Sequence, residues 1–151
     1  MEYIEQFYVI GIAVKTSNQR EQAAQDIPAL WQRFIVENCS ARIPNKVDDT
    51  VYCSYLDYEK DHMAPYTTLI GCRVTSLDTI PGGMVGETLG GGSYAKFTAT
   101  GNITEGIVYD EWLKIWSAGL ARRFTTDFEV YSPKVRQQES AEIDIFVAIE
   151  P

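Results

Sequence analysis

The chain has 151 residues, 45% of them hydrophobic and 23% charged, which is enough to bury the core of one globular domain. Its formal net charge of −8 argues against direct binding to nucleic acid or to anionic membranes, because both require a basic surface. Three cysteines without CxxC spacing and one histidine, His62, argue against a zinc site or a disulfide framework, so we expect buried free thiols and no metal or cofactor.

The N-terminal residues 1–6 are acidic and lack the pattern of a signal peptide. No apolar run approaches the roughly 18 residues that a membrane span needs. We therefore expect a cytoplasmic protein that does not enter a membrane.

The first half of the chain is predicted to form a strand, a helix and a β-hairpin. Its first segment is β-branched and aromatic, which is typical of a central strand. Asp26 and Pro28 indicate a helix start, and apolar residues then recur at helical spacing. The expected elements are a strand over residues 3–14, a helix over 26–38, and strands over 50–58 and 66–74 joined by a charged turn that contains His62.

The second half is predicted to repeat this order after a loop over residues 76–86. The glycines of residues 90–93 lack the sequence context of a phosphate-binding loop, so we interpret them as a turn. The expected elements are a strand over residues 93–101, a helix that ends near Ala121, and strands over 124–132 and 142–149.

Strand, helix, strand and strand thus occur twice, which predicts duplicated βαββ units and an α+β fold. We expect a single domain over 1–151, with pseudo-repeats over 1–76 and 87–151. Two main helices would cover one face of a curved antiparallel sheet. The face without helices would then hold a central ligand cleft.

The strand around Glu129 carries the main functional signal. Successive side chains in a strand point to opposite faces, so Phe128 and Val130 share one face, and Glu129 and Tyr131 share the other. The first pair is apolar and is predicted to lie in the core. The second pair either points to water from an edge strand or lines a cavity, where a buried carboxylate beside a phenol would favour an apolar cation.

Short motifs along the whole chain add a resemblance to a known family. They are Phe7-x-Val9-x-Gly11-Ile12, Ile27-Pro28-x-Leu30-Trp31-x-x-Phe34, Tyr52-x-x-Tyr55-x-Asp57-Tyr58-Glu59-x-Asp61, Tyr66-x-x-x-Ile70-Gly71, Gly92-x-Tyr94-Ala95-x-Phe97, Trp112-x-x-Ile115-Trp116, Phe128-Glu129-x-Tyr131 and Ile143-Asp144-Ile145. In this order they resemble the gyrase-inhibitor-like effector-binding domain. That domain occurs at the C-terminus of some AraC- and MerR-type transcription regulators and also as stand-alone proteins.

The resemblance implies a duplicated βαββ unit with a central cleft. It also implies that the glutamate of the Phe-Glu-x-Tyr strand, here Glu129, faces the cleft and pairs with a lipophilic cation, as in drug-binding members. A chain of 151 residues has no room for an additional helix-turn-helix domain. We therefore expect a stand-alone member, similar to drug-binding proteins carried on integron cassettes.

We accordingly expect a binding module for lipophilic cationic molecules, with no catalytic residues. Tyr52 and Tyr55 lie on opposite faces of their strand, so only some of the candidate aromatic residues can line one cleft. Trp112 and Trp116, spaced i, i+4, are equally typical of helix packing in a core. The candidate ligand-binding residues are Glu129, Tyr131, Tyr94, Trp112, Trp116, Tyr52, Tyr55, Tyr66 and Phe146.

Two other functions remain open at this point. Some stand-alone relatives are similar to hydrolases of strained electrophiles, in which Glu129 would act as a general base and Tyr131 or Tyr94 would donate a proton. The protein would alternatively bind a gyrase or the DNA-binding partner of a regulator, and the sequence does not decide whether it forms a homodimer.

Overall fold

The computed structural model describes residues 1–61, 63–133 and 141–151. His62 of the expected charged turn lies outside these residues, and so do residues 134–140 between the expected strands over 124–132 and 142–149. The helices are α1 (Gln22–Val36), α2 (Cys39–Arg42) and α3 (Ile107–Ser117), with short 3-10 turns at Gln19–Glu21 and Ile103–Glu105. The strands are β1 (Glu2–Ile4), β2 (Phe7–Thr16), β3 (Lys46–Leu56), β4 (Tyr66–Val74), β5 (Val85–Leu89), β6 (Gly92–Gly101), β7 (Thr126–Tyr131) and β8 (Ala141–Ala148).

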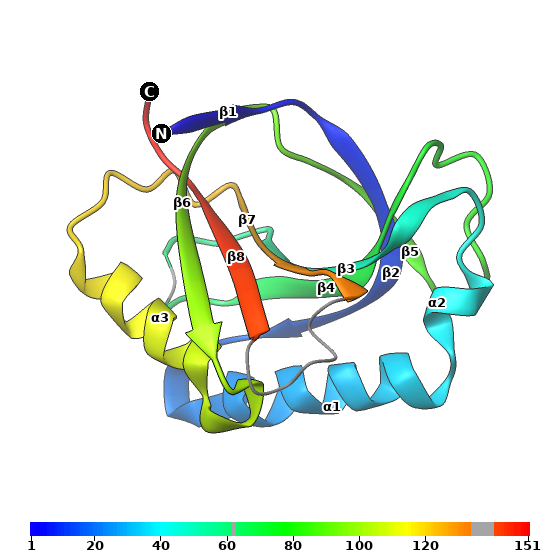
Figure 1. Cartoon of the computed structure of the whole chain (residues 1–151), viewed down its shortest axis with the longest axis horizontal. Helices are drawn as coiled ribbons and strands as arrows, with labels where there is room; N and C mark the ends of the chain where they lie inside the picture. Colours follow the sequence, from blue (N-terminus) through cyan, green and yellow to red (C-terminus); the bar gives the residue numbers. More distant parts are fainter. Residues whose placement is uncertain (62, 134–140) are drawn as a thin grey trace.

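The strands form one antiparallel sheet in the order β1-β6-β8-β7-β3-β4-β2-β5. The chain runs from β1 almost directly into β2, and from β5 into β6, yet β2 pairs with β5 while β1 pairs with β6. The segment β1–β2 and the segment β5–β6 bend at the same place in the structure. There Gly90 and Gly91 take left-handed φ values of +79° and +81°, which glycine adopts without strain. The sheet therefore curls round on itself (Figure 1), and one of its faces becomes an interior.

Large apolar side chains fill this interior. Phe128 of β7 stacks on Phe146 of β8, with ring centroids 5.0 Å apart, and meets Phe7 edge to face at 5.3 Å. Val9, Leu69 and other buried residues complete the same cluster. Phe128 and Val130 thus lie in the core, as predicted from the alternation along their strand.

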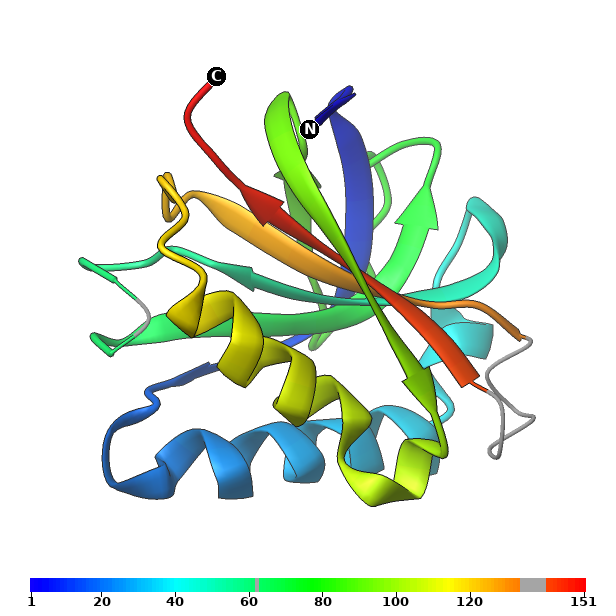
Figure 2. The same cartoon turned by 60° about the vertical axis from the view of Figure 1, so that its left-hand side comes forward.

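The two long helices lie on the outer face of the sheet, next to each other (Figures 1 and 2). Leu30 and Phe34 of α1 pack on the outer side of β2 and β4, among residues that include Ile12 and Ile70. Ile115 of α3 packs on the half of the sheet that contains β8. The duplicated βαββ order and the α+β class predicted from the sequence are confirmed.

The structure departs from the predicted elements at several places. The helix α1 begins at Gln22, so Asp26 is not its N-cap and Pro28 lies inside the helix. Glu21 precedes α1 in a left-handed conformation (φ +59°), a start for which the sequence gives no signal. The predicted loop before residue 87 conceals the short edge strand β5, whose register on β2 extends from Phe7↔Leu89 to Gly11↔Val85.

Candidate functional site

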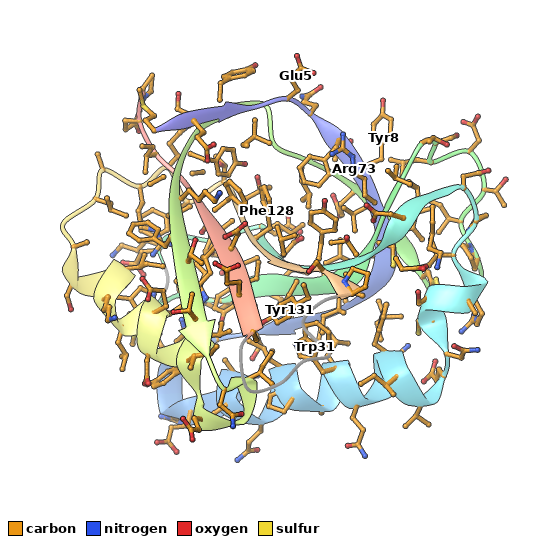
Figure 3. The ribbon with its side chains drawn as sticks, viewed as in Figure 1. Glu5, Tyr8, Trp31, Arg73, Phe128 and Tyr131 are labelled. Atoms are coloured by element: carbon orange, nitrogen blue, oxygen red, sulfur yellow. The ribbon has the colours of Figure 1, made fainter. Side chains whose placement is uncertain are left out.

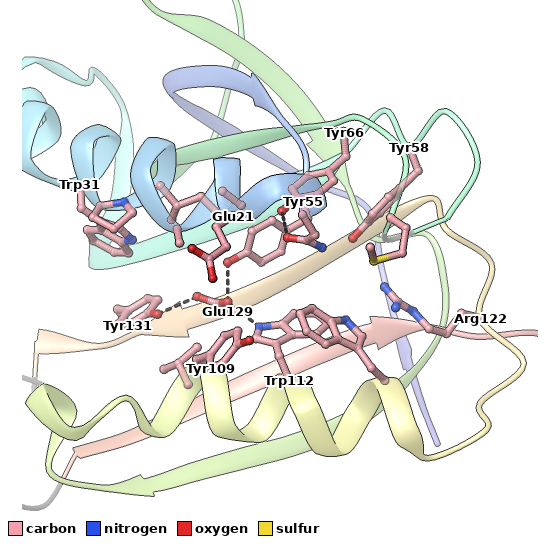
Figure 4. A pocket seen from close by; sticks show the side chains of 18 residues that line it. Glu21, Trp31, Tyr55, Tyr58, Tyr66, Tyr109, Trp112, Arg122, Glu129 and Tyr131 are labelled. Atoms are coloured by element: carbon pink, nitrogen blue, oxygen red, sulfur yellow. Dashed lines mark hydrogen bonds between the residues drawn. The ribbon is translucent and has the colours of Figure 1, made fainter.

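A cavity of about 750 Å³ lies on the outer side of the sheet, where α1 and α3 flank β7 (Figure 4). Cavities of this volume are typical of sites for drug-sized ligands. The first half of the chain contributes Asn18, Glu21, Ala23, Ala24, Ile27, Pro28, Trp31, Tyr55, Tyr58, Met63 and Tyr66. The second half contributes Val108, Tyr109, Trp112, Trp116, Arg122, Glu129 and Tyr131.

Glu129 lies in the wall of this cavity and is only 1% exposed. The Tyr131 hydroxyl donates to its Oε1 at 2.6 Å. The Tyr55 hydroxyl and the Trp112 indole N–H donate to its Oε2 at 2.6 and 2.7 Å (Figure 4). None of the ion pairs in the described residues involves Glu129. Aromatic residues therefore hold the carboxylate in place by hydrogen bonds, without a basic partner from the described chain.

Burial controls the protonation of this network. It raises the pKa of the Glu129 carboxyl above its ordinary value, and the hydrogen bonds from Tyr131, Tyr55 and Trp112 offset part of that rise. The pKa values of Tyr55 and Tyr131 are raised well above the ordinary value, first by burial and then by nearby charges that include Glu129. Both phenols therefore keep their protons at neutral pH and act as donors.

A second buried carboxylate, Asp127, lies on the same strand as Glu129. Its Oδ2 accepts hydrogen bonds from the Tyr58 hydroxyl at 2.6 Å and from Arg122 Nη2 at 2.8 Å, and its Oδ1 accepts the Ala148 N–H at 2.8 Å. Burial raises the pKa of Asp127, and the Arg122 guanidinium is the largest of the effects that oppose this rise. This carboxylate is paired with a cation, whereas Glu129 is not.

Six of the nine candidate residues lie together in the cavity wall: Glu129, Tyr131, Tyr55, Tyr66, Trp112 and Trp116. Tyr66 contacts the Tyr55 ring edge to face at 5.9 Å and donates from its hydroxyl to Asn18 Oδ1 at 2.8 Å. Trp112 is both a core residue, 8% exposed, and a wall residue. The alternatives of core and cavity wall are therefore not exclusive for this side chain.

Tyr52, Tyr94 and Phe146 lie elsewhere, which corrects the expectation of a cleft on the face without helices. All three belong to the cluster inside the curled sheet. The Tyr52 ring meets Phe7 at 5.4 Å, and the Tyr94 hydroxyl is 2.8 Å from Thr126 Oγ1. The reason is the curl of the sheet, which fills the face without helices and leaves the cavity on the helical side.

The sequence interpretation missed several wall residues, among them Trp31 and Tyr58. Trp31 projects from α1 and meets the Tyr131 ring edge to face at 4.8 Å (Figure 3). The predicted strand over residues 50–58 would place Tyr58 on the same face as Tyr52, but the strand β3 ends at Leu56 and Asp57 takes a left-handed φ of +53°. This break places Tyr58 on the side of the sheet that faces the helices. An aspartate tolerates that conformation better than most residues, which is a weak signal in the sequence.

The arrangement suits recognition of an organic ligand by aromatic surface and one carboxylate. Within the described residues, no cluster of histidine, cysteine and carboxylate side chains could hold a metal ion. The cysteines Cys39, Cys53 and Cys72 are free and buried, as predicted. No helix in the described part of the chain is long and apolar enough to span a membrane.

Comparison with known proteins gives consistent results. Residues 1–149 match the model of a family described as integron-associated effector binding protein. The chain is 32% identical over 143 residues to the "Putative transcriptional regulator protein YobU" of Bacillus subtilis (strain 168), covering 92% of this chain and 89% of that protein.

Two solved structures share the fold over almost the whole chain. The integron cassette protein VCH_CASS2 from the mobile metagenome of Vibrio cholerae has a TM-score of 0.78 and 27% identity, and the match covers 99% of this chain and 94% of that one. The structure of SAV2435 bound to tetraphenylphosphonium has a TM-score of 0.79 and 21% identity, with the same coverage of both chains.

Proposed function

The chain belongs to the integron-associated effector-binding protein family, and we propose that its cavity binds lipophilic organic cations, with Glu129 as the pairing charge. Membership in an effector-binding family confirms the resemblance found in the sequence motifs. The proposal about ligand class depends mainly on one observation. Glu129 is a buried carboxylate in an aromatic cavity, and no basic residue of the described chain pairs with it.

An organic cation meets the physical needs of such a site. A buried charge without a partner is unfavourable, and a bound cation would compensate it. The aromatic rings of the wall would contribute apolar contact, and cation–π attraction of about 0.5–2 kcal/mol for each suitably placed ring. A small inorganic cation would lose its hydration shell and gain few oxygen ligands from this largely aromatic wall, so an apolar cation fits the wall better. The structure of SAV2435 with tetraphenylphosphonium supports this ligand class by analogy of fold.

We propose binding rather than turnover. A general base needs a lone pair directed at its substrate. Both carboxylate oxygens of Glu129 already accept short hydrogen bonds from the protein: Oε1 accepts one and Oε2 accepts two. This arrangement favours a fixed charge over a group that collects a proton.

The proposal can be tested with two ligands of matched shape. Methyltriphenylphosphonium and methyltriphenylsilane differ chiefly in charge, since both carry one methyl and three phenyl groups arranged tetrahedrally around the central atom. We expect the cation to bind more tightly in isothermal titration calorimetry, and to raise the melting temperature more at equal concentration. Equal affinity for the two compounds would contradict charge pairing, and failure of every lipophilic cation to bind would reject the function.

A further inference from the structure

Arg122 lies in the wall of the same cavity as Glu129. The indole ring of Trp112 lies between the two side chains. The Trp112 N–H donates to Glu129 at 2.7 Å, and the Trp112 ring centroid lies 5.8 Å from Arg122 Cζ. Figure 4 shows Arg122 and Glu129 on either side of Trp112 in the wall. A ligand of ordinary drug size that contacts Glu129 therefore also comes close to Arg122.

The guanidinium of Arg122 is only partly satisfied by the protein. Its side chain is 6% exposed, and Nη2 donates to Asp127 at 2.8 Å. The buried Nε and Nη1 atoms have no hydrogen-bond acceptor among the described residues. Nε carries one N–H and Nη1 carries two, and buried donors of this kind are rarely left without an acceptor in native proteins.

Aromatic rings cover these donors, and one of them is held by a strained backbone. The Phe124 ring centroid lies 4.4 Å from Arg122 Cζ, and the Tyr58 ring centroid lies 6.0 Å away. Phe124 has a φ of +54°, which is rare for a bulky residue. Such strain is often found at ligand-binding sites, where the surrounding structure must hold it in place. Movement of this ring would uncover the guanidinium.

We infer that Arg122 is a second ligand contact. Its free N–H groups donate a hydrogen bond to an acceptor atom of a cation that is held at Glu129. The acceptor is a carbonyl, carboxamide or carboxylate oxygen separated from the cationic centre by a short linker. Because Asp127 already balances the charge of Arg122, the contact selects an acceptor atom and does not require a full negative charge. This inference rests on the proposed function, and it narrows the ligand class to lipophilic cations with a remote acceptor.

The test uses alkyltriphenylphosphonium ions whose alkyl arms, two to six carbons long, end in either a carboxamide or an isopropyl group of similar shape. The ratio of the two affinities at each arm length is the acceptor preference. In the wild-type protein we expect this preference to peak at one arm length, where the carboxamide oxygen reaches Arg122. At that length the preference should be about tenfold higher than in a variant without the free donors.

Two variants change the free donors in different ways. Arg122→Lys keeps the charge beside Asp127 but cannot present the planar fork of a guanidinium. The double variant Arg122→Met, Asp127→Asn removes the buried ion pair as a unit, so neither charge is left alone. Tyr58→Phe is the matched control, because it removes one hydrogen bond to Asp127 and leaves the Arg122 donors intact. Phe124→Gly keeps a left-handed backbone and uncovers the guanidinium, so it should raise the preference.

The outcomes separate this inference from the proposed function. If the isopropyl ligands bind and their affinity depends on Glu129, but the acceptor preference is unchanged in both Arg122 variants, the Arg122 contact is wrong and the proposed function stands. If Tyr58→Phe lowers the preference as much as Arg122→Lys does, the effect arises from the Asp127 network and the inference is also wrong. If no phosphonium ion binds the wild-type protein, both are rejected.

Discussion

Replacing Glu129 by glutamine isolates the charge that the proposed function requires. Glutamine has nearly the same shape, and its Oε1 can accept the hydrogen bonds from Tyr55 and Trp112. Its amide nitrogen would replace the oxygen that accepts from Tyr131, and the hydroxyl of Tyr131 can accept a hydrogen bond instead. We therefore expect Glu129→Gln to fold and to keep the shape of the cavity.

The expected loss follows from Coulomb's law in a buried site. Two unit charges about 5 Å apart at an effective dielectric constant of about 20 attract each other by about 3 kcal/mol. The dipole of the glutamine carbonyl retains part of this attraction. We expect Glu129→Gln to weaken the binding of methyltriphenylphosphonium by about 2–3 kcal/mol, which lowers the affinity by about 30- to 150-fold. The affinity for methyltriphenylsilane should change by less than about threefold, because this ligand carries no charge and no hydrogen-bond acceptor.

Isothermal titration calorimetry of both ligands with both proteins measures this difference, and circular dichroism checks that the variant is folded. Glu21→Gln is the control variant, because Glu21 also lines the cavity wall but is exposed to solvent. Its effect should be small and should disappear in high salt, whereas the effect of the buried Glu129 should persist. An equal loss for the cation and the neutral ligand in Glu129→Gln would refute charge pairing.

Three further predictions concern protonation, the donors and the location of the cavity. Burial raises the pKa of Glu129, so the affinity for a phosphonium cation should fall when the pH is lowered. This fall should occur at a higher pH than an ordinary glutamate would give, and titrations of Glu129→Gln should lack it. Trp112→Phe removes a donor to Glu129; it should raise the midpoint of that step and lower the free energy of unfolding by about 1–2 kcal/mol, and an unchanged midpoint would contradict the assigned hydrogen bond. Tyr94→Phe should lower the melting temperature while cation affinity stays within about twofold, and a large loss of affinity would place the binding site inside the curled sheet.

Much of the fold follows from local patterns in the sequence. Alternation along the strand β7 correctly separates Phe128 and Val130 from Glu129, because a central strand with a period of two has only two faces. The same rule separates Tyr52 from Tyr55 on β3. The order of strands and helices also follows from hydrophobic periodicity, and the motif series indicates the correct family.

The position of the cavity does not follow from the same patterns. Both faces of this sheet are apolar, so alternation does not tell which face is filled by the sheet itself and which is covered by helices. That choice depends on the curl, which requires long-range pairing of β1 with β6 and of β2 with β5. Sequence alternation therefore predicts Tyr94 and Phe146 in the site, although they lie in the interior core. Sequence patterns do not predict Arg122 in the site. Its contacts with Asp127 and with the Phe124 ring depend on the backbone turn before β7, for which no sequence pattern was found.

The burial of Glu129 couples the stability of the protein to ligand binding. Since its pKa is raised in the folded state, the folded protein binds the proton more tightly than the unfolded chain does. The contribution of Glu129 to the free energy of unfolding therefore falls as pH rises from the ordinary carboxyl pKa to the raised one, and above that range the buried anion destabilises the fold. A bound cation opposes this loss only when the carboxylate is ionised. Stabilisation by a phosphonium ligand should thus be greatest at the pH values where the ligand-free protein bears the full penalty of the buried charge.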